Sequence, residues 1–399
     1  MLAVVALVVG ASVAGVRTAQ ALRKFGYQDE VILLGEENEI PYDKPPLSKG
    51  VLAGTMPADR IRLTTPEAAR QLGVTLRLGE RAVSVDPRAH EVSLGTGESL
   101  RYDHLVIATG CSARRPAWSD VDGVQVLRTL GDSLRLAARL HAGTRLVVVG
   151  GGFIGAEVAA TACALGVSVT VVDPLPVPIG RVVGDRVGRL VCALHERHGV
   201  HTRFGVGVSG IEQGSVTLAD GSVLPADSVV VGVGVTPNVS WLETSDIPVD
   251  QGIVCDSYCR LAGVPDVYAA GDVARWLHPR HEEYVRVEHW TNAAEQAERV
   301  ARNIACPQDT AEYAPVEYVW SDQHDWKIQI TGRPETAVEA VVIDTGRERA
   351  RFAALYGEPG GGLVGAVTVN WPRATLAARK VLARGATLAE AHDDLGELV

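Results

Sequence analysis

The chain contains the same pattern twice, and this repetition limits its possible folds more than any other feature. Residues 3–9 form a continuous apolar run that ends at Gly10, and residues 145–149 form a similar run that ends at Gly150. Each run is followed by a glycine-rich turn, a helix-like stretch and a second apolar run. Continuous apolar runs are typical of parallel strands, because helices cover both faces of such a sheet. The sequence therefore predicts two βαβ units, each opening a doubly wound α/β domain.

The second half of each repeat also matches. In both copies, short alternating strands precede an apolar strand that begins after an aspartate and ends at a glycine. Asp103 and Gly110 are seven residues apart in the first copy, as are Asp227 and Gly234 in the second. Each βαβ unit thus carries a small antiparallel insert, which is typical of dinucleotide-binding domains of this layout.

The remaining sequence does not form a third repeat. Residues 267–272 read as another apolar strand, which we interpret as completing the first domain's sheet. Beyond residue 315 the apolar residues alternate, which predicts an antiparallel sheet, followed by a helix over residues 373–382. The predicted strands there cover residues 327–331, 338–343, 352–356 and 363–369. The predicted domains are a discontinuous first domain (1–110 and 235–308), a second domain (111–234) and a C-terminal α+β domain (309–399).

Composition and charge exclude several classes. The formal net charge is −10, whereas a nucleic-acid-binding protein normally carries a basic surface, so we expect no nucleic-acid partner. The apolar start lacks a basic region and stops at Arg17, too short to span a bilayer, so we expect neither a signal peptide nor a membrane partner. Six scattered cysteines suggest a reducing cytoplasm. No cysteine–histidine cluster has metal-site spacing, so we expect no metal.

The two glycine-rich turns carry the chemistry. The first glycine of such a loop permits a tight strand-to-helix turn, the second admits a pyrophosphate, and the third allows helix and strand to pack closely. Gly150, Gly152 and Gly155 complete this pattern, whereas Ser12 replaces the middle glycine between Gly10 and Gly15. The first loop could therefore be a plain turn without a ligand. Two such loops in register favour two dinucleotide sites.

An acidic residue follows the second strand of each unit. Glu36 lies 26 residues after Gly10, and Asp173 lies 23 residues after Gly150. A carboxylate at this place accepts hydrogen bonds from ribose hydroxyls and repels a 2′-phosphate. The sequence therefore favours NADH over NADPH, although Arg181 is the nearest base after Asp173.

Further motifs give the chain a family resemblance. They are Pro41-Tyr-Asp-Lys-Pro-Pro-Leu-Ser-Lys49, Ala108-Thr-Gly110, Tyr268-Ala-Ala-Gly-Asp272, Arg286-Val-Glu-His-Trp290 and Trp320-Ser-Asp-Gln-His-Asp-Trp-Lys327. With the paired glycine loops, the chain resembles the FAD-dependent NADH:ferredoxin reductases that serve bacterial oxygenases, within the pyridine-nucleotide-disulfide oxidoreductase superfamily. The resemblance covers nearly the whole chain.

The resemblance implies that the first loop binds FAD and the second binds NADH. It places Lys49 beside the flavin, paired with Glu157, as the catalytic pair, with Asp272 on the ribityl chain and Arg128 on the FAD phosphates or adenine. A solvated surface charge is the alternative for Lys49, and a helix cap is the alternative for Asp272. The remaining implied cofactor-binding residues are Gly10, Ser12, Ala14, Gly15, Glu36, Lys44, Val83, Ala108, Thr109, Gly110, Gly271, Glu288, His289, Trp290, Gly150, Gly152, Phe153, Ile154, Gly155, Asp173 and Gly234.

Some positions depart from the family pattern or leave two interpretations open. Lys44 stands where the family usually has arginine. A guanidinium that can form two parallel hydrogen bonds is thereby replaced by the compact charge of an ammonium. Trp320 could line the flavin or simply pack in a core. Trp326 and Trp371 occupy positions where the family usually has less aromatic residues, and we expect them to affect partner docking.

The cysteines argue against a thiol relay. The chain has neither a C-x4-C near the first domain's flavin motif nor a C-x2-C in the second domain. Cys255 and Cys259 are expected on one strand, roughly 13 Å apart, too far to form a disulfide. We expect both to be small core residues. Electrons must then leave the flavin directly, which suits a one-electron iron–sulfur acceptor.

The main hypothesis is therefore an oxidoreductase that transfers hydride from NADH to FAD and single electrons to an iron–sulfur ferredoxin. The alternative enzyme is an NADH oxidase, or a quinone or monodehydroascorbate reductase, with a small-molecule acceptor. A non-enzymatic alternative is a flavoprotein resembling apoptosis-inducing factor. An acidic ferredoxin would need a basic patch, for which five arginines (275, 280, 302, 333 and 373) are candidates; scattered solubility charges are the other interpretation.

Overall fold

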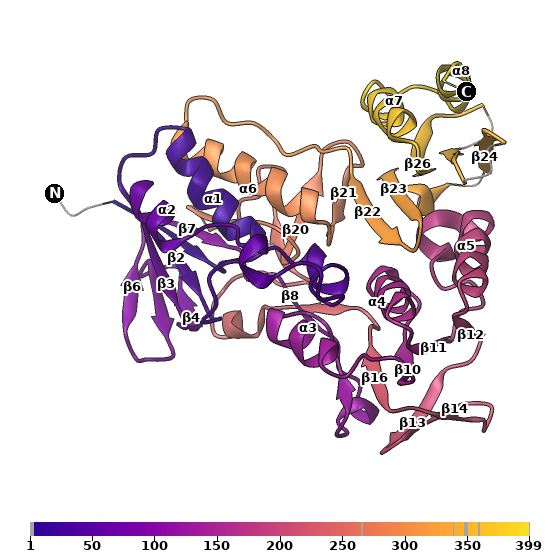
Figure 1. Ribbon diagram of the computed structural model, residues 1–399. Coiled ribbons are helices and arrows are strands. Elements are labelled where there is room, and N and C mark those ends of the chain that lie inside the picture. Colours follow the sequence, from indigo (N-terminus) through magenta and orange to yellow (C-terminus); the bar gives the residue numbers. More distant parts are fainter. Residues whose placement is uncertain (1–3, 265, 338, 347–349, 358–359, 399) are drawn as a thin grey trace. The chain divides into compact units, whose positions relative to one another are not determined.

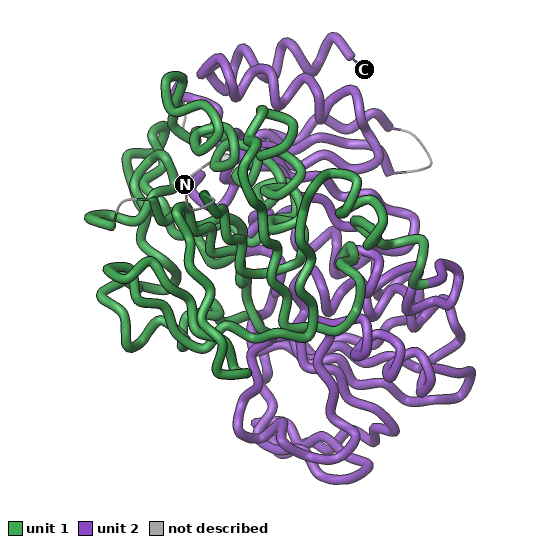
Figure 2. Tube along the Cα trace, turned by 90° about the vertical axis from the view of Figure 1, so that its left-hand side faces the viewer, with its two compact units in different colours: residues 1–43, 58–112, 235–315 green, residues 44–57, 113–234, 316–399 purple. Residues whose placement is uncertain are grey.

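The computed structural model describes residues 4–264, 266–337, 339–346, 350–357 and 360–398. The chain forms two compact units, coloured separately in Figure 2. Unit 1 comprises residues 1–43, 58–112 and 235–315, and unit 2 comprises residues 44–57, 113–234 and 316–399. The division into three domains given above stays a prediction.

Unit 1 is built on a five-stranded parallel sheet with the order β19-β7-β1-β2-β3. Its strands are β1 (Val5–Val9), β2 (Glu30–Gly35), β3 (Val74–Leu78), β7 (His104–Ile107) and β19 (Val267–Ala269). Helices α1 (Val13–Lys24) and α6 (Trp290–Ala305) lie side by side (Figure 1). Because β19 pairs with β7, the prediction that the chain returns to the first sheet is confirmed.

Two smaller antiparallel or mixed sheets accompany this core. The predicted insert is β4 (Ala82–Asp86), β5 (Glu91–Leu94) and β6 (Ser99–Arg101). The other small sheet is β18 (Ile253–Cys255), β20 (Ala274–His278) and β21 (Glu283–Val285). Unit 1 also contains η2 (Ala58–Ile61), α2 (Pro66–Gln71) and η4 (Ser240–Leu242).

The expected strand through Cys255 and Cys259 is wrong. Strand β18 ends at Cys255, and Cys259 lies in a turn with φ of 63°. Both side chains are buried and both thiols are free, so their assignment as small core residues is confirmed.

Unit 2 repeats the parallel arrangement with the strand order β12-β11-β10-β16-β9. Its strands are β9 (Val124–Gln125), β10 (Arg145–Val149), β11 (Ser168–Asp173), β12 (His201–Phe204) and β16 (Ser228–Val231). Its helices are η1 (Pro45–Ser48), η3 (Ala117–Ser119), α3 (Leu130–Ala137), α4 (Phe153–Ala164) and α5 (Gly180–Arg197). The antiparallel insert is β13 (Val208–Glu212), β14 (Ser215–Leu218) and β15 (Val223–Pro225). Short strands β8 (Cys111–Ala113) and β17 (Val235–Pro237) pair where the chain passes between the units.

The C-terminal part of unit 2 is a five-stranded sheet with the order β22-β23-β26-β25-β24. Its strands are β22 (Tyr318–Gln323), β23 (Trp326–Gly332), β24 (Glu339–Asp344), β25 (Phe352–Gly357) and β26 (Leu363–Val369). All paired neighbours are antiparallel, as predicted, although residue 338 lies outside the described residues. η5 (Pro334–Thr336), α7 (Pro372–Ala383) and α8 (Leu388–Gly396) complete this part; α8 has no counterpart in the sequence prediction.

The two extra tryptophans lie inside this part. Trp326 and Trp371 are 5% and 1% exposed. Buried rings offer a partner no surface for direct contact, and an effect of these residues on partner docking stays a prediction. Their rings fill the sheet's apolar core instead.

The aspartates that open the last strand of each repeat have one structural role. Asp103 accepts a hydrogen bond from the Val5 N–H at 2.7 Å, and Asp227 accepts one from the Arg145 N–H at 2.9 Å. Each carboxylate thereby ties the start of a central strand to its neighbour. This explains why both copies of the repeat carry an aspartate there.

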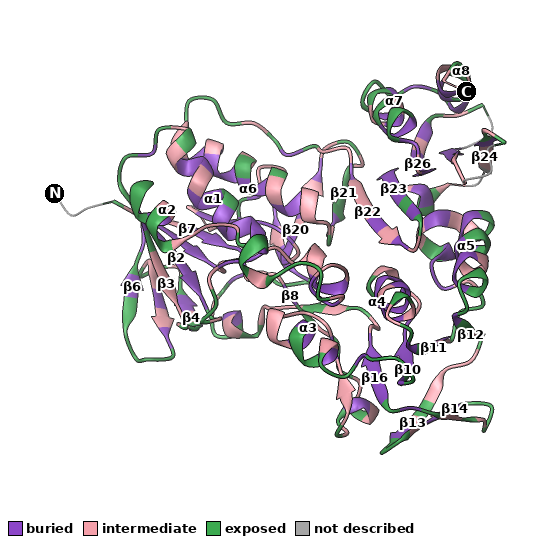
Figure 3. Ribbon diagram, viewed as in Figure 1, coloured by how far each residue is buried: buried purple, intermediate pink, exposed green. Residues whose placement is uncertain are grey.

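Figure 3 shows how the central strands of both parallel sheets are buried while the inserts are more exposed. Strands β1 and β10 are buried along nearly their whole length, as continuous apolar runs predict. Within the described residues, no helix is long and apolar enough to cross a membrane.

Candidate active site with two nucleotide loops

The first glycine loop joins β1 to α1 in unit 1. Gly10 has a φ of +115°, and a Cβ there would lie 2.2 Å from the Ala108 carbonyl oxygen. A Cβ on Gly15 would lie 1.7 Å from the Gly10 carbonyl oxygen. Only glycine fits either position, as the turn and the close packing of helix and strand require. Ser12 is the N-cap of α1, and its side chain makes no capping hydrogen bond.

The loop after β7 is held by a residue that sequence reasoning missed. Asn238 Nδ2 donates to the Thr109 carbonyl oxygen at 2.8 Å, while Thr109 Oγ1 donates to the Asn238 carbonyl oxygen at 3.0 Å. Ser112 Oγ donates to Asn238 Oδ1 at 2.7 Å. These bonds fix the Ala108–Gly110 turn next to the glycine loop. Asn238 is far away in the sequence and belongs to no recognised motif.

Gly271 and Asp272 follow β19, at the same edge of the sheet as the glycine loop. Gly271 has a φ of +80°, and a Cβ there would lie 3.0 Å from the Ala14 Cβ of α1. Its N–H donates to Gln296 Oε1 of α6 at 2.8 Å. The Asp272 backbone is held as well, because its carbonyl oxygen accepts from Arg286 Nη1 at 3.2 Å. The backbone of Gly271 and Asp272 is thus fixed close to the N-terminal turn of α1.

The predicted ring-lining segment leads into α6. Glu288 pairs with Arg286 at 2.7 Å, and Trp290 Nε1 donates to Asp43 Oδ1 at 2.5 Å. His289 is the N-cap of α6. The carboxylate of Glu36, after β2, is largely exposed and lies 3.5 Å from Arg81, so it remains accessible to a ribose.

The second glycine loop joins β10 to α4 in unit 2. Gly150 has a φ of +105°, and a Cβ there would lie 2.3 Å from the Gly232 carbonyl oxygen. A Cβ on Gly155 would lie 1.9 Å from the Gly150 carbonyl oxygen. A Cβ on Gly152, in contrast, would meet no atom of the described residues within 4 Å. The missing side chain of Gly152 thus leaves open space at the N-terminus of α4, and helix N-termini are a common place for phosphates to bind.

Asp173 stands at the end of β11, as predicted. Its carboxylate accepts hydrogen bonds from the Gly151 N–H at 2.8 Å and the Leu175 N–H at 2.9 Å. Each carboxylate oxygen has a further lone pair for a ribose hydroxyl. Asp173 therefore also orders the glycine loop, a role that the sequence did not indicate.

Lys49 and Glu157 meet within unit 2. Lys49 Nζ lies 2.7 Å from Glu157 Oε2, so the predicted contact is confirmed. The Lys49 side chain is 22% exposed and the Glu157 side chain 4% exposed. Lys49 follows η1, which is anchored by hydrogen bonds from Ser133 to the Leu47 carbonyl and from Thr161 of α4 to the Ser48 carbonyl. The lysine is therefore partly buried and paired, and the surface-charge alternative is wrong.

Two serines that the sequence did not single out complete the Glu157 site. Ser48 Oγ donates to Glu157 Oε2 at 2.5 Å, and Ser321 Oγ of β22 donates to Glu157 Oε1 at 2.7 Å. Ser48 and Ser321 both lie in motifs quoted for the resemblance, but without assigned roles. Three donors thus surround one buried carboxylate, as a buried charge requires.

The other predicted residues occupy defined positions. In unit 2, Lys44 Nζ donates to the Arg128 carbonyl oxygen at 3.3 Å, Phe153 and Ile154 begin α4, and Gly234 has a φ of +100°. In unit 1, Val83 is 44% exposed on β4. The first glycine loop and the Lys49–Glu157 pair thus belong to different units. Their roles toward cofactors stay predictions.

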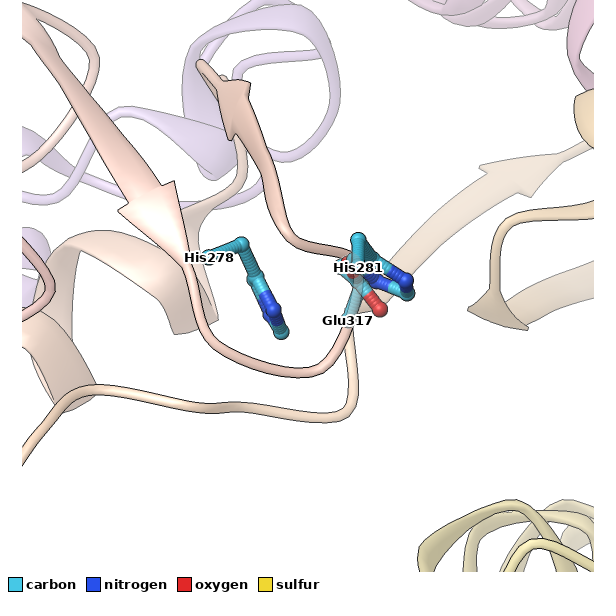
Figure 4. A group of neighbouring side chains, drawn as sticks. All are labelled: His278, His281 and Glu317. Carbon is cyan, nitrogen blue, oxygen red and sulfur yellow. The ribbon is translucent and has the colours of Figure 1, made fainter.

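A histidine pair lies at the end of β20 in unit 1. The rings of His278 and His281 are 4.2 Å apart, and His278 is buried (Figure 4). The Arg280 N–H donates to His278 Nδ1 at 3.2 Å.

The fold and the loops define a class. Each unit has a parallel sheet, a glycine loop with positions that only glycine fits, and a carboxylate after the second strand. These are the parts of a reductase that binds two nucleotide cofactors. The basic Lys49 beside a buried carboxylate adds a polar pair suited to redox chemistry.

Comparison with known proteins identifies the family. The family model described as pyridine nucleotide-disulphide oxidoreductase matches residues 5–297, and the one described as reductase C-terminal matches residues 318–394. The chain belongs to the pyridine nucleotide-disulphide oxidoreductase family. The predicted class, a FAD- and NAD(H)-dependent oxidoreductase with a C-terminal α+β part, is therefore confirmed.

Individual relatives match over nearly their full length. The chain is 36% identical to the ferredoxin–NAD(+) reductase component of the p-cumate 2,3-dioxygenase system of Pseudomonas putida, covering 94% of this chain and 92% of the relative. It is 35% identical to rhodocoxin reductase of Rhodococcus erythropolis, covering 94% and 89%. Among solved structures, putidaredoxin reductase in its covalent complex with putidaredoxin matches with a TM-score of 0.91 at 31% identity, covering 96% and 93%. The ferredoxin reductase for the CYP199A2 system of Rhodopseudomonas palustris matches with a TM-score of 0.92 at 33% identity, covering 97% and 96%.

Proposed function

We propose that this protein is an NADH:ferredoxin reductase that supplies electrons to an oxygenase. The observation that carries the proposal is the full-length similarity, at 33–36% identity, to reductase components that work with ferredoxins or redoxins. The glycine loops and the Lys49–Glu157 pair agree with it. No observation favours the small-molecule acceptors considered above.

The residues present fit both cofactors. Gly10 and Gly15 permit the tight turn and close packing that bring the N-terminus of α1 to the end of β1, and the Ser12 side chain makes no capping hydrogen bond there. At α4, Gly152 leaves the space next to the helix N-terminus open. The N–H groups of these helix N-termini bind phosphates, FAD at the first loop and NADH at the second. Glu36 and Asp173 would accept hydrogen bonds from the adenosine riboses.

FAD, when bound, takes two electrons together as hydride and releases them one at a time. The chain's own part is electrostatic. The Lys49 ammonium supplies a positive charge that favours the reduced, more negative state, and Glu157 holds the ammonium in place. Asp272 is held by its backbone at the end of β19, where it would orient the ribityl chain.

The acceptor is proposed to be an iron–sulfur ferredoxin, because a thiol relay lacks its parts. All six cysteines are free, and Cys255 and Cys259 are fully buried. Burial raises the pKa of the Cys259 thiol to about 12, so this residue is a poor nucleophile at neutral pH. Free cysteines also suit the cytoplasm, which we propose as the location.

A steady-state comparison of acceptors tests the proposal. Purified protein loaded with FAD is mixed with NADH and either a bacterial [2Fe–2S] ferredoxin, ferricyanide or oxygen. We expect rapid reduction of ferredoxin and ferricyanide, slow reduction of oxygen, and much slower flavin reduction with NADPH. Rapid oxygen consumption with no ferredoxin reduction would instead establish an oxidase, and a preference for NADPH would refute the role of Asp173.

A further inference from the structure

The Glu157 carboxylate is the end of a longer hydrogen-bonded chain within unit 2. Oε2 accepts from Lys49 and Ser48, whereas Oε1 accepts from Ser321 alone among the described contacts. Ser321 Oγ in turn accepts from Gln323 Nε2 at 3.0 Å. Gln323 Oε1 lies 3.0 Å from His195 Nε2 of α5.

The chain ends in a histidine cluster. His195 Nδ1 lies 3.1 Å from His324 Nε2. The His324 ring stacks on the His198 ring at 4.1 Å, and His198 Nε2 lies 3.8 Å from Asp325 Oδ1. Side chains from β22, α5 and the turn before β23 therefore form a continuous path to the carboxylate on α4.

The chemistry of these groups fixes the direction of the first three hydrogen bonds, and the neutral state of His195 fixes the fourth. A carboxylate only accepts, so the Ser321 hydroxyl donates to Glu157, and Gln323 donates its amide N–H to Ser321. The Gln323 carbonyl oxygen only accepts, so His195 carries its proton on Nε2. A neutral His195 then accepts at Nδ1, and His324 donates from Nε2. All four bonds therefore point toward Glu157.

Burial agrees with neutral imidazoles. Ser321 and Gln323 are 0% exposed and His195 is 5% exposed. Burial lowers the pKa of His195, and burial together with the neighbouring His195 and His198 lowers the pKa of His324 to about 3. Protonation of His195 would place a charge among buried groups that already have fixed partners, which is costly.

We propose that Ser321, Gln323 and His195 are positioning residues for Glu157. They hold Oε1 from one side, so that Oε2 is directed at Lys49. The chain explains why a serine and a glutamine, two residues apart on one strand, face a buried carboxylate instead of contributing to the apolar core of the sheet. Its kinetic consequence rests on the proposed function, whereas its geometry does not.

The first test reads the chain without any turnover. Protein labelled with ¹⁵N-histidine is examined by NMR between pH 5.5 and 8, with His195→Gln used to assign the His195 signals. We expect His195 to be neutral and protonated on Nε2 throughout. A ring protonated on Nδ1 alone, or doubly protonated at pH 7, would overturn the proposed direction.

The second test compares variants that remove or retain each donor. Ser321→Ala and Gln323→Leu break the chain, whereas Ser321→Thr keeps the hydroxyl and His195→Gln keeps a donor near the Nε2 position. Ser228→Ala is the matched control, because Ser228 is a buried serine of unit 2 whose hydroxyl has no hydrogen-bond partner among the described residues. The rate and NADH dependence of flavin reduction are measured by stopped flow.

We expect Ser321→Ala and Gln323→Leu to reduce the limiting rate about fivefold, which corresponds to about 1 kcal/mol in the barrier, with less than a twofold change in NADH affinity. Ser321→Thr, His195→Gln and Ser228→Ala should stay within twofold of the native rate. A native rate in Ser321→Ala would overturn the proposal. If the native protein is itself not reduced by NADH, the proposed function fails, and the histidine NMR still decides whether the chain exists.

Discussion

Replacing Lys49 by methionine removes the ammonium while keeping a long apolar stem. Among the described residues, Glu157 then keeps two hydroxyl donors, Ser48 and Ser321, while it stays buried. Breaking a fully buried pair costs about 3–5 kcal/mol. Because Lys49 is partly exposed and the two serines remain, we expect a loss of about 2 kcal/mol in the free energy of unfolding.

Thermal unfolding and flavin reduction measure the two consequences. A loss of about 2 kcal/mol lowers the unfolding midpoint of a unit of this size by about 4–8 °C. We expect FAD to remain bound but to be reduced by NADH about tenfold more slowly, which corresponds to about 1.4 kcal/mol of transition-state stabilisation.

Lys24→Met is the matched control. Lys24 also pairs with a glutamate, Glu298, but the two side chains are 65% and 48% exposed. Exposed pairs contribute about 0–1 kcal/mol, so this variant should unfold and be reduced like the native protein. Adding Glu157→Gln to Lys49→Met should restore part of the lost stability, because no charge then stays buried. If Lys49→Met behaves like Lys24→Met in both assays, the role assigned to the buried pair is incorrect.

Three further predictions concern the loops, the thiols and the histidine cluster. Gly155→Ala should retain FAD but lose reduction by NADH, because its Cβ would lie 1.9 Å from a backbone oxygen. Gly152→Ala should fold normally and mainly weaken NADH affinity, as measured by stopped-flow titration; equal behaviour of the two variants would contradict the loop geometry. Burial raises the pKa of Cys192 to about 11 and of Cys259 to about 12. A thiol reagent at pH 7.5 should therefore leave the reduction of ferricyanide by NADH intact, whereas inactivation that tracks one modified cysteine would argue for a catalytic thiol. The pKa of His324 falls from 6.5 to about 3 on folding, so the unfolded state binds more protons than the folded state below pH 6.5. The free energy of unfolding should therefore decrease as the pH is lowered from 6.5 to 3, by up to about 1.4 kcal/mol per pH unit. His324→Gln should flatten this slope in thermal unfolding.

The parts of the fold that depend on local sequence could be predicted. The glycine loops are such a case, because backbone conformation and close contact at Gly10 and Gly150 allow no other residue. The Lys49–Glu157 contact joins residues 108 positions apart, and only the family resemblance indicated it. Without that resemblance, no periodicity or spacing relates the two residues.

The support around the site could not be predicted, because tertiary structure brings it together. His195 lies on α5 with no motif around it, and Asn238 lies in a loop. For the tryptophans the signal existed: Trp326 alternates with Ile328 and Ile330, which indicates one buried face of a strand. The turn at Cys259 gave no such signal, since a positive φ in a cysteine has no sequence signature.

The contact between Ser321 and Glu157 has a consequence for building hybrid reductases. Residues 316–399 look like an exchangeable C-terminal module, because they form their own sheet and helices. Yet one serine of that sheet completes the surroundings of a carboxylate on α4, and Thr161 of the same helix holds the segment that carries Lys49. A C-terminal segment exchanged between relatives should therefore bring a hydroxyl at position 321, and the proposed hydrogen-bonded chain also requires a carboxamide at position 323. A graft without them would leave the buried carboxylate with fewer donors, so we expect the hybrid protein to be less stable.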